Sequence, residues 1–167
     1  MLFASFKSYI LKNKFISNIL RNEYIINNKI LIKLHPNYSI LIENSIRAKK
    51  NSYSPYSRFA VGAALLTVKN KIYTGANVEN ASYSLSICAE RVAFSKAVSE
   101  GDKKFKAIAI AANGREFVFP CGACRQFMYE FGGDIDVIIV RSVKQFRIVK
   151  LFELLPGAFD KTFLKIK

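Results

Sequence analysis

The chain has no tryptophan, one histidine and only three cysteines in 167 residues. An odd number of thiols cannot pair off completely, so a closed disulfide framework is a poor explanation, and free thiols favour a reducing compartment. No apolar run reaches the roughly 18 residues that are needed to span a membrane, so no transmembrane segment is predicted. The length suits one domain with a substantial core.

Acidic residues are also scarce: 12 Asp and Glu stand against 26 Lys and Arg, a net charge of +14 at pH 7. A strongly basic protein suggests acidic partners such as nucleic acid. The basic residues are dispersed, however, and form no tight cluster interleaved with aromatic residues. We therefore expect no stable nucleic-acid partner.

Glycine and proline are absent from residues 1–34, and this segment contains one acid, Glu23. Its alternating basic and apolar residues suit an amphipathic helix, as found in organellar transit peptides. A loosely attached tail without a catalytic role explains the same composition. We predict a basic extension over residues 1–34 and one domain over residues 35–167. We expect the protein in the cytoplasm, with organellar targeting as the alternative.

From residue 35 onward, helices and strands are expected to alternate. Helices are predicted over 36–50, 88–99, 122–131 and 151–155, and strands over 61–68, 72–78, 105–112, 136–140 and 146–149. Gly101 follows the second of these helices, and Gly132 follows the third, as expected at helix ends. This order predicts an α/β domain in three layers.

All three cysteines lie in two short motifs, Cys88-Ala89-Glu90-Arg91 and Pro120-Cys121-Gly122-Ala123-Cys124. Both motifs fall at predicted helix starts, where partial positive charge stabilises thiolates. Three thiolates can bind one zinc ion and leave its fourth position open, as in catalytic sites. Zinc lowers the pKa of its bound water to about 7 and so supplies hydroxide at neutral pH.

Glu90 follows the first cysteine by two residues and is the candidate proton shuttle. It would take a proton from the zinc-bound water and deliver it to the reacting substrate. A surface glutamate paired with lysine is the plain alternative. Arg91 and Arg125 lie beside the two motifs, and a cation there would offset the charge of three thiolates.

The cysteines have two alternative roles besides an open zinc site. A lone Cys-x-x-Cys is also typical of a buried pair of thiols or a redox dithiol. A structural zinc site with His35 as the fourth ligand would leave Glu90 without a role.

Cys-x-Glu followed by Pro-Cys-x-x-Cys is the zinc deaminase signature in its three-cysteine form. The segment from about residue 41 to residue 159 resembles the small, tetrameric, three-cysteine branch of the cytidine deaminase family. The matching blocks occur in the family's order and cover residues 53–59, 61–66, 75–83, 88–91, 120–126 and 154–159. The resemblance implies a three-layer α/β/α fold with a central mixed five-stranded sheet, one Zn2+ per subunit, and a homotetramer with shared active sites.

The resemblance also implies residue roles. Asn77 and Glu79 correspond to the pair that grips the ribose 3′-hydroxyl, although a turn after a strand would use the same residues. Phe59 resembles the aromatic residue that stacks on the pyrimidine, and Phe159 resembles a second one supplied across a subunit interface; core packing is the alternative for either. The remaining implied roles are a backbone contact to the base for Ala89, the lining of a neighbouring subunit's site for Ala81 and Tyr83, and hydrogen bonds to the zinc thiolates for Arg91.

The implied function is hydrolytic deamination of cytidine and deoxycytidine to uridine and deoxyuridine in pyrimidine salvage, with Glu90 as the proton shuttle. A deaminase of a cytosine nucleoside analogue such as blasticidin S would use the same chemistry. An RNA or DNA cytosine deaminase suits the basic charge, but such enzymes usually carry His where this chain has Cys88. A non-catalytic zinc-binding module would tolerate any change of Glu90.

Overall fold

The computed structural model describes residues 36–164. The predicted extension over residues 1–34 and His35 lie outside the described residues, so the domain boundary and the alternative zinc ligand stay predictions. Among residues 36–164, no helix is long and apolar enough to cross a membrane.

Five strands form one sheet. They are β1 (Val61–Thr67), β2 (Ile72–Ala76), β3 (Phe105–Ala112), β4 (Asp136–Ser142) and β5 (Gln145–Lys150), in the order β2-β1-β3-β4-β5. The β3–β4 pair is parallel and the other neighbouring pairs are antiparallel. The predicted mixed five-stranded sheet is therefore confirmed.

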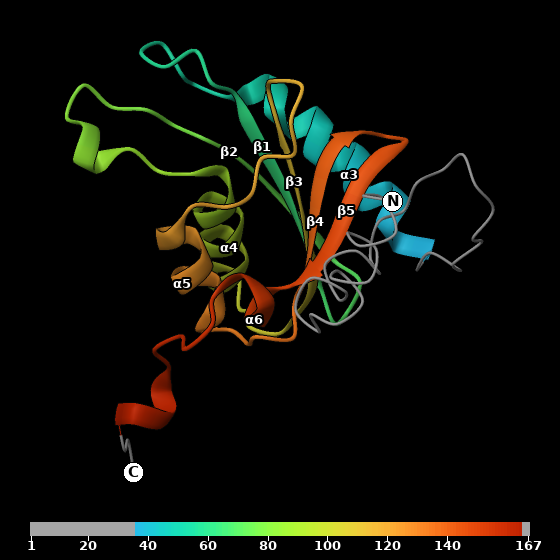
Figure 1. The fold of residues 1–167 in the computed structure, drawn as a ribbon, viewed down its shortest axis with the longest axis vertical. Coiled ribbons are helices and arrows are strands. Elements are labelled where there is room, and N and C mark those ends of the chain that lie inside the picture. The colour runs from blue at the N-terminus through green and yellow to red at the C-terminus, as the bar shows by residue number, and fades with distance from the viewer. Residues whose placement is uncertain (1–35, 165–167) are drawn as a thin grey trace, which may run out of the picture.

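Helices cover both faces of this sheet (Figure 1). One face carries α3 (Pro36–Ala48), and the other carries α4 (Ala89–Ser99), α5 (Gly122–Tyr129) and α6 (Leu151–Leu154). Three short 3-10 helices complete the described chain: η1 (Lys49–Asn51), η2 (Tyr83–Leu85) and η3 (Lys161–Leu164). The predicted three-layer α/β/α arrangement is confirmed.

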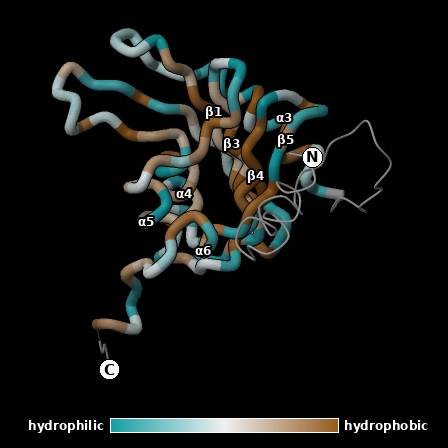
Figure 2. Tube along the Cα trace, in the orientation of Figure 1, coloured by the Kyte–Doolittle hydropathy of each residue, from teal (hydrophilic) through white to brown (hydrophobic). Residues whose placement is uncertain are grey.

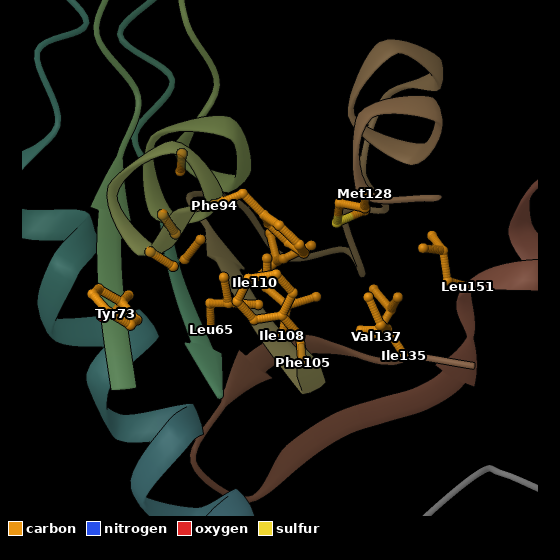
Figure 3. Packing of buried hydrophobic residues seen from close by; sticks show 14 of the residues in the cluster. Leu65, Tyr73, Phe94, Phe105, Ile108, Ile110, Met128, Ile135, Val137 and Leu151 are labelled. Carbon is orange, nitrogen blue, oxygen red and sulfur yellow. The ribbon is translucent and has the colours of Figure 1, made fainter. Parts of the chain in front are cut away.

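Each face of the sheet has its own core, because side chains alternate between the faces of a strand. Leu65, Ile108 and Val137 belong to the cluster that includes Phe94 of α4 (Figure 3). A second cluster on the α3 side is built from other residues of the same strands, with Leu41 of α3. Burial on both faces makes the central strands continuously apolar, as the hydropathy colouring shows (Figure 2).

Several predicted boundaries differ from the structure by one or two residues, and two of these differences lie near the candidate site. The strand predicted over 72–78 ends at Ala76, because Val78 leaves the sheet and forms isolated bridges with Tyr53 and Ile87. The first predicted helix ends at Ala48 and continues as η1. The early end of β2 brings residues 77–79 against the loop that precedes β1, which is the start of the candidate site.

Candidate metal centre and active site

The three cysteines meet at the starts of α4 and α5, as predicted. Cys88 and Cys121 have extended backbones and are the N-cap residues of these helices, and Cys124 lies in the first turn of α5. The three sulfur atoms all lie within 4.8 Å of one another. Cys124 is buried, Cys88 is half-buried and Cys121 is exposed. Two helix starts on one face of the sheet therefore present three sulfurs to one point.

This donor set fits zinc. Three sulfurs drawn from two separate helices match the ligand type and number of an open zinc site. A hydrogen bond from Cys124, with help from Arg91, lowers the pKa of Cys88 to about 5, whereas the pKa of Cys124 is raised by the same pairing and by burial. The lowered pKa of Cys88 favours its thiolate, which is the form that binds a metal.

Glu90 lies in the first turn of α4 and is only 4% exposed. Burial raises the pKa of its carboxyl group, and the negative charge of Cys88 adds to this effect. A raised pKa lets a carboxyl group hold a proton closer to neutral pH, which suits a group that must accept and release one. The buried carboxyl beside the sulfur cluster is not the surface ion pair of the plain alternative.

The two predicted arginines differ in their contacts. Nη2 of Arg91 lies 3.9 Å from the Cys88 sulfur and donates to the carbonyl of Ser86 at 3.2 Å. Its Nε is buried and has no hydrogen-bond partner among the described residues. Arg125 instead donates to the carbonyls of Pro120 and Leu154, so it ties α5 to the end of α6.

Asn77 and Glu79 bind the loop that carries Phe59. The Asn77 side-chain oxygen accepts hydrogen bonds from Ser52 Oγ at 2.6 Å and from the Val61 amide at 2.8 Å, and its nitrogen donates to the Phe59 carbonyl at 2.9 Å. These three bonds fix the loop between η1 and β1 at both ends.

The Glu79 carboxylate holds the middle of the same loop. It accepts from the amides of Tyr56 and Ser57, at 2.9 and 3.2 Å, and from the Ser57 hydroxyl. The Ser57 hydroxyl lowers the pKa of Glu79, so this carboxylate is firmly ionised. Arg58, next in the loop, adopts a left-handed backbone with φ of 56°. Asn77 and Glu79 therefore order the loop that contains Phe59.

Three of the remaining predicted residues lie on projecting segments. Ala81 and Tyr83 belong to the long connection after β2, and Tyr83 is 73% exposed with its ring edge-on to Tyr56. Phe159 is 57% exposed in the segment after α6, which extends away from the sheet and helices (Figure 1). Neither aromatic ring is packed in the core of its own chain.

Ala89 behaves differently from these exposed residues. It is fully buried at the first position of α4, between Cys88 and Glu90. Within a single chain, the predicted residues that lie together at the starts of α4 and α5 are Cys88, Ala89, Glu90, Arg91, Cys121 and Cys124. The predicted residues that stay exposed on the surface of the same chain are Ala81, Tyr83 and Phe159.

Sequence reasoning missed the hydroxyl groups of Ser52 and Ser57 and the amide of Gln126. Gln126 donates to the carbonyl of Phe159 at 2.7 Å and so attaches that segment to α5. Each of these contacts joins residues more than twenty positions apart, and no local pattern marks them. The one available signal was position, since all three residues lie inside or next to the motif blocks.

This chain is similar to known proteins. The family model for the cytidine and deoxycytidylate deaminase zinc-binding region matches residues 36–141. A protein named probable cytidine deaminase from Dictyostelium discoideum is 50% identical over 131 residues, which are 75% of this chain and 88% of that protein. The cytidine deaminase of Sporosarcina psychrophila is 48% identical over 122 residues, 72% of this chain and 90% of that protein.

Solved structures agree with these matches. The crystal structure of cytidine deaminase from Burkholderia pseudomallei has a TM-score of 0.69 and 43% sequence identity to this chain. The match covers 72% of this chain and 97% of the Burkholderia chain. The family match and the three clustered sulfurs together confirm the prediction of a zinc-binding deaminase. The chain belongs to the cytidine and deoxycytidylate deaminase family.

Proposed function

We propose that this protein hydrolyses cytidine and deoxycytidine to uridine and deoxyuridine, releasing ammonia. The observation that carries the proposal is the sulfur cluster of Cys88, Cys121 and Cys124, within 4.8 Å, with the buried carboxyl of Glu90 in the same helical turn as Cys88. The similar proteins named above are called cytidine deaminases, which favours this substrate over a nucleoside antibiotic or a polynucleotide.

Cys88, Cys121 and Cys124 would hold the zinc ion. When bound, zinc supplies a water molecule whose pKa is lowered to about 7. The lowered pKa of Cys88 favours the thiolate form that a metal needs. Arg91 offsets part of the negative charge of the thiolates, since its guanidinium group lies beside Cys88. Its buried Nε has no hydrogen-bond partner among the described residues, so its N–H group remains available as a donor.

Glu90 moves the protons. Its carboxylate accepts a proton from the attacking water and passes it to N3 of the cytosine ring as the new C–O bond forms at C4. It then transfers the second proton of that water to the amino group, the C4–N4 bond breaks, and ammonia leaves. The raised pKa of Glu90 suits both transfers, because the group must be a base and then an acid at the same pH.

Substrate recognition would use the loop between η1 and β1. Phe59 would stack on the pyrimidine, the backbone of Ala89 would contact the base, and Asn77 and Glu79 would bind the ribose 3′-hydroxyl. Both polar side chains keep hydrogen-bonding capacity beyond the loop contacts, since an amide has two N–H groups and a carboxylate has about four acceptor sites.

The proposed active unit is a homotetramer with shared sites. The exposed Phe159 and Tyr83, together with Ala81, lie on projecting segments and would reach a neighbouring subunit. Burying such large aromatic groups against a second copy is favourable, because each removes considerable apolar area from water. Reduced thiols are needed at the metal centre, so we place the enzyme in a reducing compartment, the cytoplasm, in pyrimidine salvage.

The test is turnover of cytidine by the zinc-loaded protein, followed by the ultraviolet change to uridine. Glu90→Gln removes the proton shuttle and keeps the size of the side chain, so turnover should fall at least about a hundredfold. Glu43→Gln on the exposed surface of α3 makes the same change of charge and should leave the rate unchanged. A wild-type protein that contains zinc and leaves cytidine intact contradicts the proposal.

A further inference from the structure

We propose that Gly75 is a positioning residue for this reaction. It carries no side chain, and it thereby sets how closely the first turn of α4 packs on β2, and so where Cys88 and Glu90 stand. The inference rests on the proposed function, because the proposed function assigns metal binding to Cys88 and proton transfer to Glu90.

Gly75 is buried in β2, where it pairs with Ala63 of β1. A Cβ atom built on it would lie 2.3 Å from the Ala89 carbonyl oxygen, 2.6 Å from the Ala93 amide nitrogen and 3.0 Å from Val92 Cβ. Its φ angle lies outside the left-handed region. Gly75 is therefore required by the close approach of the helix and not by the conformation of its own backbone.

The two closest atoms are backbone atoms of α4. Ala89 and Ala93 are four residues apart, which is the spacing of the helical N–H···O=C hydrogen bond. A side chain at position 75 would thus press on the first turn of the helix where its hydrogen bonds begin. Backbone atoms cannot rotate away as a side chain can, so the helix and the strand must separate.

The separation is large on the scale of a metal site. Ordinary contacts of a Cβ atom begin near 3.4 Å, so a contact of 2.3 Å requires a movement of about 1 Å. Cys88 directly precedes Ala89 and would move with it, whereas Cys121 and Cys124 belong to α5. Metal–ligand distances tolerate only about 0.2 Å. A shift of about 1 Å in a catalytic group costs on the order of a hundredfold in rate.

Gly62 provides a matched control on the neighbouring strand. It pairs with Ala76, the residue after Gly75, but a Cβ built on it would lie 2.2 Å from the Lys49 amide nitrogen and 2.3 Å from the Ser45 carbonyl oxygen. The same substitution there is equally crowded, and it pushes on α3 and η1. Neither of these elements carries a cysteine.

The experiment compares Gly75→Ala with Gly62→Ala. Each full-length protein is stripped of zinc by a chelator and titrated with Co2+, whose absorption reports thiolate ligation and coordination geometry. Circular dichroism and thermal unfolding of the metal-free proteins show whether each is folded and how much stability it has lost. Turnover of cytidine is measured separately on the zinc-loaded proteins.

Gly75→Ala should bind Co2+ at least about tenfold more weakly than the wild type, with an altered spectrum. It should also lose about a hundredfold in kcat/KM. Gly62→Ala should lose a similar amount of thermal stability and keep the wild-type spectrum and Co2+ affinity. A folded Gly75→Ala protein with wild-type Co2+ binding overturns the proposal, as does an equal loss of Co2+ affinity in both variants.

Two further measures keep the test decisive. If Gly75→Ala does not fold, Val92→Ile tests the same close contact between β2 and α4. This substitution adds one methyl group to the side chain that faces Gly75. Weaker Co2+ binding by this variant supports the proposal, and unchanged binding overturns it. If the wild-type protein binds Co2+ through thiolates but does not deaminate cytidine, the proposed function fails while the effect of Gly75 on the metal centre can still be measured.

Discussion

Asn77→Ala is expected to lower the stability of the protein as well as its activity. Its side chain makes three hydrogen bonds, with Ser52 Oγ, the Val61 amide and the Phe59 carbonyl. Alanine removes all of them and leaves the half-buried Val61 N–H without its partner. A residue that only contacted the substrate would not have this effect on the free protein.

The expected size follows from the bonds. A partly buried hydrogen bond contributes about 0.5–1.5 kcal/mol net, and the bonds to Ser52 and Val61 are partly buried whereas the bond to the Phe59 carbonyl is exposed. The expected loss in the free energy of unfolding is therefore roughly 1–3 kcal/mol. The loop between η1 and β1 would lose its anchor at both ends. KM for cytidine should therefore rise because Phe59 is no longer held in place.

Urea denaturation, followed by circular dichroism at equal protein concentrations, measures this loss. Asn113→Ala, at an exposed position just beyond β3, is the control and should change stability by less than about 0.5 kcal/mol. If Asn77→Ala unfolds at the same urea concentration as this control, the structural role assigned to the Asn77 side chain is wrong.

Three further changes have defined outcomes. Phe94→Ala empties the centre of an aromatic cluster with Phe105 and Phe131 and should cost about 3–5 kcal/mol in urea denaturation; a loss below about 1 kcal/mol would contradict the packing. Because burial raises the pKa of Glu90 above 4.5, the contribution of this group to the stability of the metal-free protein should fall as the pH rises from about that value. The stability of Glu90→Gln relative to the wild type should therefore grow with pH, and a constant difference would contradict this. Arg91→Gln should weaken zinc binding about 10–100-fold in a competition titration, whereas unchanged affinity would remove its role in charge balance.

The sequence predicts the fold where local patterns are strong. The apolar runs of β1, β3 and β4 lie in strands buried on both faces, and Gly101 and Gly132 have positive φ angles just after α4 and α5. The helix starts at Cys88 and Cys121 also follow from the motifs. The end of β2 does not, because long-range bridges of Val78 decide it.

The candidate site is less predictable than the fold. The two cysteine motifs predict that the three sulfurs meet, because three thiolates can bind one metal ion. The arrangement of Asn77 and Glu79 around the Phe59 loop depends on Ser52 and Ser57, which lie 25 and 22 positions from their partners. Such contacts arise only after the sheet has brought the end of β2 beside the start of β1.

Zinc-dependent deamination is tested by measuring the rate of cytidine deamination against the amount of zinc bound per chain. The protein is stripped of metal, reloaded in steps, and assayed for both quantities. We expect a rate near zero without zinc that rises in proportion to bound zinc and saturates at about one ion per chain. Deamination that persists in the fully stripped protein, or a zinc-loaded protein without deamination, would contradict this expectation.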